Sequence, residues 1–338
     1  MRAIARPANT SVPGDVLENF QASSGSVWLG ANSFEERCLG SLLRLADCGA
    51  KVQRAIILHY PTKAYLEAED MTRRRDHRNR IRDQTVRLGV SSIEDLDIQA
   101  YGAQQLLGVL QNLVANPRVK LLVVDITCLP KIHVVVLAAQ LAADLRPDLH
   151  IIICYSSPES YGNLDQNAKE NGWSDVIISP LSEQAIMQHE LHSRGLVVAG
   201  HGSDRLWAAL HELEPSGGTS VFGSVPRRPD ITKLSEKLKL KLLRQLLIAG
   251  KDAWPQEVVD LADMGLIEAI AQKEIDDVRL FKAPVVLYPL GPKSLIVAAA
   301  LHLARNHPSR SWFVYPVCSA YDVSYSDGIG GSLWIEND

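Results

Sequence analysis

The chain has 338 residues, of which 46% are hydrophobic and 22% are charged, and its formal net charge at pH 7 is −4. This composition is typical of a soluble globular protein, and the length allows two domains of ordinary size. No apolar run reaches the roughly 18 residues of a membrane span, and the N-terminus lacks the apolar core of a signal peptide. We therefore expect a cytoplasmic protein with no membrane partner, and the negative charge argues against direct DNA or RNA binding.

The cysteines predict neither a disulfide framework nor a metal centre. They are odd in number and contain no C-x-x-C pair, so the spacing typical of a zinc site is missing. Cys128 follows an apolar strand, and we weigh a catalytic thiol there against an ordinary loop cysteine. We expect no metal and no cofactor.

Residues 1–24 are rich in Pro, Ser, Gly and Asn and are expected to form a flexible lead. A first run of strands and helices follows. The expected strands are 27–29, 53–60, 93–99, 121–124, 150–155 and 175–178, and the expected helices are 33–45, 71–87, 104–114 and 132–145. Ser33 and Glu36 have the spacing of a capping box, which would start the helix 33–45.

The expected helix 71–87 is dominated by arginine. A helix with cations nearly all round is most often solvated. The alternative is that some of Arg73, Arg74, Arg75 and Arg78 contact phosphates or an acidic partner, a task that suits the planar guanidinium.

The sharpest pattern is D-x-T-x-x-x-K, formed by Asp125, Thr127 and Lys131. It begins where the apolar strand 121–124 ends and finishes where the helix 132–145 begins. Open α/β sheets bind their ligands at such strand ends, and helix N-termini attract anions. The alternative is structural: Asp125 and Thr127 cap the helix, and Lys131 is a solvated residue of its first turn.

The same order of elements restarts at residue 194. The expected strands are 196–199, 219–222, 285–288 and 312–315, and the expected helices are 205–213, 231–248, 266–273 and 295–304. Segment 258–262 fits either type, and 229–275 is interpreted as a helical insertion.

Corresponding residues in the two runs have similar spacing. Gly30 precedes Lys131 by nearly as many residues as Gly200 precedes Lys293, and both lysines follow a proline directly. Both closing strands end in a tyrosine with a second tyrosine at the same distance beyond it. We interpret this as an internal duplication. The predicted fold is α/β, with two tandem Rossmann-like halves, 25–193 and 194–338, mainly parallel sheets and a pseudo-twofold relation.

Two halves related in this way would place their strand-end loops around one shared cleft, with Lys131 and Lys293 on opposite sides. Glycine loops and helix N-termini between them would make it an anion site. The candidate ligand-binding residues are Gly30, Asn32, Ser33, Asp125, Thr127, Lys131, Gly200, Ser203, Gly291 and Lys293.

The D-x-[ST]-x-x-x-[RK] pattern after a central strand resembles the signature of CARF domains, and Asp125, Thr127 and Lys131 match it position for position. The turn PLGPK, with Gly291 and Lys293, is similar to the lysine-bearing turn of CARF-like and SAVED-like halves, but it lacks the acid and the hydroxyl. A SAVED domain is itself a fused pair of CARF-like units, which agrees with the duplication.

This resemblance implies a sensor of cyclic nucleotide second messengers in prokaryotic antiviral defence. It implies phosphate contacts from loop N–H groups and the two lysines. Contacts to ribose or base edges would come from Thr127, Asn32 and Ser33. We recognise no attached nuclease, protease or membrane effector, so the signal would pass to a separate effector protein or defence-complex subunit.

Two other functions stay open. A ring nuclease of the same fold would cleave its cyclic ligand without a metal, and His201 in the G-H-G-S turn is the best candidate base, although an exposed loop histidine needs no such role. An interaction subunit would bind no nucleotide and would dock through the arginine face 73–82 and the helix 231–248. Complete G-x-G-x-x-G and G-x-x-x-x-G-K-[ST] motifs are absent from the sequence, which disfavours classical dinucleotide and triphosphate enzymes.

Overall fold

The computed structural model describes residues 3–8, 12, 14, 17–18, 20, 25–60, 68–99, 102–142, 146–161, 173–182, 185, 193–199, 219–224, 257–259, 284–318 and 326–337. The candidates Gly200, His201 and Ser203 lie outside these residues. So do the expected helices 205–213, 231–248 and 266–273. Within the described residues, no helix has the length and apolarity needed to cross a bilayer.

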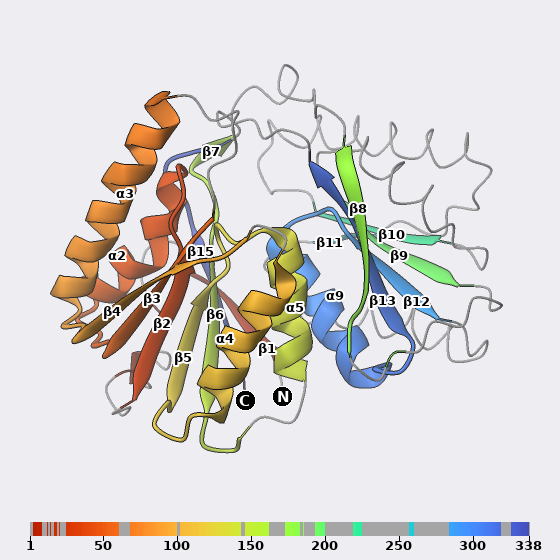
Figure 1. Ribbon diagram of the computed structural model, residues 1–338, viewed down its shortest axis with the longest axis horizontal. Coiled ribbons are helices and arrows are strands. Elements are labelled where there is room, and N and C mark those ends of the chain that lie inside the picture. Colours follow the sequence, from red (N-terminus) through yellow and green to blue (C-terminus); the bar gives the residue numbers. More distant parts are fainter. Residues whose placement is uncertain are drawn as a thin grey trace. The chain divides into compact units, whose positions relative to one another are not determined.

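The first sheet contains seven strands in the order β1-β15-β6-β5-β2-β3-β4 (Figure 1). Their bounds are β1 Ala3–Ala8, β2 Ser26–Ala31, β3 Arg54–His59, β4 Ser92–Asp97, β5 Leu121–Asp125, β6 His150–Ser156 and β15 Ser332–Asn337. The strands from β6 to β4 are parallel, whereas β15 is antiparallel to both β6 and β1. The strongly apolar β5 therefore lies inside the parallel part of the sheet, as its sequence predicts.

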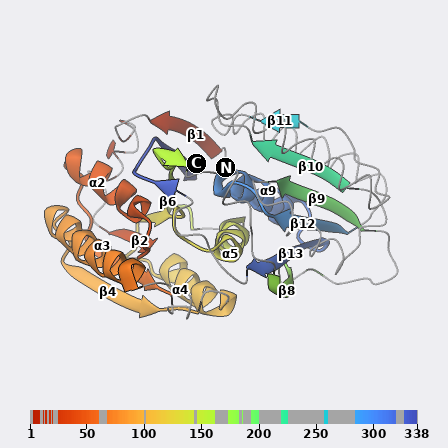
Figure 2. The same ribbon diagram turned by 90° about the horizontal axis from the view of Figure 1, so that it is seen from above.

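Helices cover both faces of this sheet (Figures 1 and 2). Their bounds are η1 Glu36–Leu39, α2 Gly40–Asp47, α3 Ala68–Arg87 and α4 Ala103–Ala115. The helix that follows β5 is α5, Lys131–Ala142, and its residues from 134 onward group with the unit of the second sheet. On one face, Leu42 of α2 and Ile81 of α3 share a buried core with Trp28 and Val123. Because alternate strand residues face opposite sides, Leu29 and Val124 face the layer that contains α4.

The second sheet contains six strands in the order β11-β10-β9-β12-β13-β8. Their bounds are β8 Trp173–Pro180, β9 Arg194–Ala199, β10 Thr219–Ser224, β11 Glu257–Val259, β12 Val285–Pro289 and β13 Ser311–Cys318. All pairs are parallel except β13 with β8. The helix α9, Lys293–Asn306, packs against β9 and β12. A small separate ladder pairs β7, Ser160–Tyr161, with β14, Ser326–Asp327.

Both sheets have the same strand order once the strands are numbered along the chain. The five parallel strands run 3-2-1-4-5 in β4-β3-β2-β5-β6 and again in β11-β10-β9-β12-β13. In each sheet an antiparallel strand flanks the fifth. This is the order of doubly wound Rossmann-like sheets. The expected α/β fold with mainly parallel sheets is confirmed.

The antiparallel strands do not follow the expected division of the chain at residue 193. The strand β8 comes after β6 in the sequence but pairs with β13, and β15 comes after β13 but pairs with β6. Each run thus gives its last strand to the other sheet. Accordingly, one compact unit consists of residues 1–133, 144–167 and 322–338, and the other of 134–143 and 168–321. Hydrophobic periodicity predicts that 175–178 is a strand, but it does not tell which sheet the strand joins.

The first helix starts differently from the prediction. The capping box does not form: η1 begins at Glu36, with Glu35 as the N-cap residue and no side-chain cap. Ser33 Oγ accepts the backbone N–H of Glu35 at 3.2 Å, and Glu36 pairs with Arg80 of α3 at 2.9 Å. Both side chains that the box requires are engaged elsewhere, so the correct prediction would have been a turn at Ser33 followed by a later helix.

Candidate functional site

The carboxyl end of β2 marks the point where the strand order of the first sheet reverses. From β2 the chain passes through α2 to β3 on one side, and β5 on the other side of β2 leads through α5 to β6. In doubly wound sheets, the loops that follow two strands with connections in opposite directions are where ligands bind. The candidate residues Asn32 and Ser33 follow β2, and Thr127 and Lys131 follow β5. The structure therefore brings these two groups to the same edge.

Asp125 and Thr127 are buried and hold the turn after β5. Asp125 Oδ1 accepts the backbone N–H of Thr127 at 2.9 Å, and Thr127 Oγ1 accepts the N–H of Ser156, at the end of β6, at 2.9 Å. The other carboxylate oxygen accepts the hydroxyl of Ser41, which in turn accepts the indole N–H of Trp28 at 3.1 Å. These bonds tie β5 to β6, α2 and β2. These contacts of the acid and the hydroxyl are structural, because they fix the turn and its neighbours.

Lys131 has a different environment from the rest of its motif. It is the first residue of α5, follows Pro130, and its side chain is half-buried. The fixed turn before it determines where the helix begins. Cationic nitrogen at a helix start, near backbone N–H groups, is an arrangement that favours anions.

Gly30 is required by packing inside the sheet. A Cβ at this position would lie 2.4 Å from Cζ2 of Trp28, which is two residues earlier on the same face of β2. The absence of a side chain thus makes room for the indole. This explanation is independent of a ligand, and the proposed ligand role of Gly30 stays a prediction.

Asn32 and Ser33 form the loop that leaves β2. The Asn32 backbone N–H donates to Leu58 O at 3.0 Å, and its Nδ2 donates to Nδ1 of His59 at 3.4 Å. Its Oδ1 is buried without a hydrogen-bond partner. The Ser33 carbonyl accepts Nδ1–H of His77, from α3, at 3.0 Å. The loop is therefore anchored to β3 and α3 while one amide oxygen stays unsatisfied.

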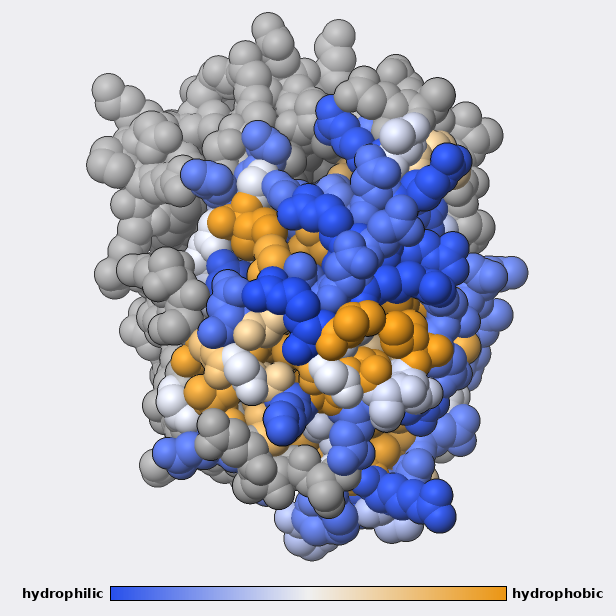
Figure 3. Space-filling model, turned by 90° about the vertical axis from the view of Figure 1, so that its left-hand side faces the viewer, coloured by the Kyte–Doolittle hydropathy of each residue, from blue (hydrophilic) through white to orange (hydrophobic). Residues whose placement is uncertain are grey.

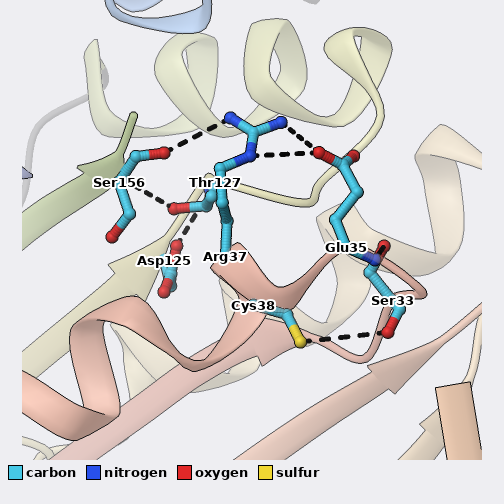
Figure 4. A network of polar contacts seen from close by, with 7 residues as sticks. All are labelled: Ser33, Glu35, Arg37, Cys38, Asp125, Thr127 and Ser156. Atoms are coloured by element: carbon cyan, nitrogen blue, oxygen red, sulfur yellow. Dashed lines mark hydrogen bonds and ion pairs between the residues drawn. The ribbon is translucent and has the colours of Figure 1, made fainter. Parts of the chain in front are cut away.

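Sequence reasoning missed an ion pair at this edge, between Glu35 and Arg37 (Figure 4). One Glu35 oxygen accepts from Nε of Arg37 at 3.0 Å and also from Nη2. The third nitrogen, Nη1, donates to the carbonyl of Ser156 at 3.3 Å. Burial lowers the pKa of Arg37, but the negative charge of Glu35 opposes this, and the pKa ends above its usual value. The guanidinium therefore stays charged although it is buried.

The second run of the chain returns to this edge next to Ser156. The backbone N–H of Ser157 donates to Gly331 O at 2.8 Å, and the backbone N–H of Gly330 donates to Ser157 O at 2.8 Å. Arg44 of α2 donates to Ser156 Oγ at 3.2 Å and to the carbonyl of Gly330. The segment before β15 thus forms part of the site's border.

Two further polar groups flank the loop. Burial lowers the pKa of His133 to about 4, and burial raises the pKa of Tyr60. Tyr60 therefore keeps its proton and donates to His133 Nδ1 at 2.8 Å. Because His133 is completely buried, it is a packing partner of Tyr60 rather than an accessible base.

The arginines of α3 mainly pair with acids of the same unit. Desolvation raises the pKa of Asp95. Hydrogen bonds from His59 and Arg82 and the charge of Arg78 lower this pKa by more than desolvation raises it, so the net shift is downward. Figure 3 shows this side of the molecule, where a band of hydrophilic side chains separates smaller hydrophobic areas. The prediction of a mostly solvated helix holds for the outer face of α3, whereas His77, Ile81 and Thr85 form a buried face.

At the carboxyl end of β12, α9 begins with Lys293 after the N-cap Pro292, which makes no side-chain cap. Gly291 is buried, Lys293 is half-buried, and Ser294 is buried with an Oγ that has no hydrogen-bond partner. In both sheets a Pro-Lys dipeptide thus precedes or begins the helix that follows the fourth parallel strand. In the described part of the chain, no three His, Cys, Asp or Glu side chains are grouped as metal ligands.

Comparisons with known proteins found no family for the chain, since no family model and no curated protein matches it. Among solved structures, a universal stress protein from Archaeoglobus fulgidus DSM 4304 has 11% identity and a TM-score of 0.26, with 86% of this chain and 96% of that chain covered. A structure from Pseudomonas aeruginosa UCBPP-PA14 assigned to the same group has 12% identity and a TM-score of 0.25, with 87% and 94% covered. Such values support no functional argument, and the Rossmann-like fold follows from the strand order itself.

Proposed function

We propose that this chain binds a cyclic oligonucleotide, or another nucleotide-type anion, at the carboxyl edge of its first sheet. We further propose that it passes the signal to a separate effector protein in cytoplasmic prokaryotic antiviral defence. The observation that carries the proposal is the ordered turn after β5. Buried bonds of Asp125 and Thr127 fix this turn, and Lys131 starts the next helix with a half-buried side chain.

Phosphate chemistry suits this edge. A phosphodiester needs charge-assisted donors, and here a lysine stands at a helix start beside the loop that leaves β2. In the proposal, Lys131 and loop N–H groups bind phosphate, and the amide of Asn32 contacts a ribose or base edge. Gly291 and Lys293 have the corresponding task in the second run.

The CARF-like and SAVED-like resemblance and the internal duplication are part of the same proposal. Their support is the strand order 3-2-1-4-5, which occurs in both sheets, each with one antiparallel strand beside the fifth. We infer that one Rossmann-like unit was duplicated and that the two copies exchanged their last strands. The pseudo-twofold relation is the arrangement that such a history predicts.

The test is a thermal-shift screen of the protein against cyclic di-, tri- and tetranucleotides. A ligand at about a hundred times its Kd adds roughly 2.7 kcal/mol of stability. We expect Lys131→Ala to weaken or remove the shift. The matched control is Lys120→Ala, which removes the same charge from the other end of β5, where Lys120 pairs with Asp148. Lys293→Ala reports whether the second turn takes part.

Chromatography of the recovered ligand then separates sensor from enzyme. An intact ligand supports the sensor, and a linear product would show a ring nuclease. If none of the nucleotides shifts the unfolding temperature, the binding proposal is wrong and the interaction subunit becomes the working model.

A further inference from the structure

The guanidinium of Arg37 lies across the switch point of the first sheet. Arg37 belongs to the segment after β2, yet its Nη1 donates to the carbonyl of Ser156 at the end of β6. Because β5 lies between β2 and β6, the side chain must pass over the end of β5. Figure 4 shows the guanidinium between Ser156 and Glu35. A cation therefore occupies the place where doubly wound sheets bind their ligands.

The two sides of this guanidinium have different partners. Nη1 holds the protein's own Ser156 carbonyl, whereas Nε and Nη2 both donate to one oxygen of Glu35. The Nε and Nη2 side presents two parallel N–H donors that can bind a carboxylate or a phosphate bidentately. An anion that replaced Glu35 would gain this side without disturbing the contact to Ser156.

Exposure places Glu35 on the solvent side of the pair. The Glu35 side chain is 21% exposed and that of Arg37 is 8% exposed. An anion arriving from solvent therefore meets the carboxylate before the guanidinium. Displaced Glu35 regains water, and the buried Arg37 exchanges one anionic partner for another. Such an exchange avoids an unpaired buried charge, which is the costly outcome for a buried ion pair.

We propose that Arg37 is a phosphate-binding residue and that Glu35 occupies its fork until an anionic ligand displaces the carboxylate. The inference rests on the proposed function. It adds Arg37 as the side chain that binds a phosphate and the Glu35 carboxylate as the group that competes with the ligand. Glu35 thereby sets an affinity threshold, since only a ligand with further contacts outcompetes a carboxylate already in place.

The experiment uses inorganic phosphate as the probe, at fixed ionic strength, because phosphate needs no base recognition. Its affinity is measured by thermal shift for the wild type, Glu35→Gln and Glu36→Gln. Glu36 is the matched control: it is the next residue, its loss changes the charge equally, and it pairs with Arg80 on the surface. A charge-assisted hydrogen bond predicts about a tenfold gain in phosphate affinity for Glu35→Gln. Glu36→Gln should match the wild type.

The double variant Glu35→Gln/Arg37→Lys keeps the positive charge but removes the fork, and it should lose the gain. Equal phosphate affinity in Glu35→Gln and Glu36→Gln, or a gain that survives Arg37→Lys, would overturn the inference and leave the pair a structural clamp. If Glu35→Gln does not fold, Glu35→Asp withdraws the carboxylate by one methylene and should change the affinity in the same direction.

The outcomes also separate this inference from the proposed function. If cyclic nucleotides do not stabilise the wild type, the proposed function is contradicted, regardless of the measured phosphate affinities. The comparison of Glu35→Gln with Glu36→Gln tests the competition between Glu35 and phosphate, whatever the natural ligand is.

Discussion

Replacement of Asp125 by asparagine tests whether the acid of the D-x-T turn is a structural group. Its Oδ1 accepts the N–H of Thr127 at 2.9 Å, and its Oδ2 accepts the Ser41 hydroxyl, which is already oriented by the N–H of Trp28. An amide has one acceptor oxygen, so one of these two donors loses its partner. Hydrogen bonds to charged groups contribute about 1.5–3 kcal/mol, and the site is buried.

We therefore expect Asp125→Asn to lower the free energy of unfolding by about 1.5–3 kcal/mol. For a unit of 150–250 residues this corresponds to a loss of roughly 3–12 °C in Tm. The assay is calorimetry or urea unfolding followed by circular dichroism. Asp148→Asn is the control, because Asp148 is 51% exposed and pairs with Lys120 at the surface. The reasoning is refuted if Asp125→Asn and Asp148→Asn unfold at the same temperature.

Two further substitutions test the packing around the site. Gly30→Ala places a Cβ 2.4 Å from the ring of Trp28 and should lower the free energy of unfolding in urea by about 1–3 kcal/mol. The control is Gly108→Ala, in the middle of α4 with open space around it, which should raise this free energy by up to about 1 kcal/mol. Equal effects of the two would contradict the packing argument. His133→Gln keeps an acceptor for Tyr60 but does not titrate. Because the pKa of His133 falls to about 4 on folding, the unfolded chain binds more protons between pH 4 and 6.5, and wild-type stability should drop across that range as the pH falls, by roughly 3 kcal/mol in total. Urea unfolding at pH 7 and pH 5 should show a smaller drop for the variant, and parallel curves would disprove the assignment.

The parallel strands were predictable because burial on both faces leaves a direct record in the sequence. Leu121 to Val124 and Val285 to Tyr288 are unbroken apolar runs, and both are central strands. The membership of β8 and β15 was not predictable. The apolar pattern predicted β8, whereas the strand β15, Ser332–Asn337, was not predicted at all. Which sheet a strand joins depends on the path of the chain through space.

The D-x-T-x-x-x-K pattern predicted the turn between β5 and α5, but it could not predict the orientation of its side chains. The sequence pattern of an acid after a buried strand is the same whether the carboxylate oxygens face a ligand or a backbone N–H. The neighbours that decide this are Ser41 and Ser156, which are distant in sequence. The packing role of Gly30 could have been predicted from the sequence. Trp28 is two residues earlier, and residues two apart on a strand share a face.

The Glu35–Arg37 pair had only a weak signal. In the run E-E-R, either glutamate fits a solvated first turn, and the sequence does not tell that Arg37 is buried while Glu36 pairs with Arg80 of a later helix. The helical assumption for 33–45 also concealed the pair, because residues two apart do not face each other on an α-helix. The turn that precedes η1 brings them together.

Hydrogen–deuterium exchange with and without a saturating cyclic tetranucleotide tests the central claim most directly, because it locates the ligand without a substitution. The account predicts slower exchange of backbone amides in the two loops at the switch point, residues 32–37 and 126–132, and unchanged exchange in α4 as an internal reference. Saturated binding that leaves both loops unprotected would contradict a ligand site at this edge of the first sheet.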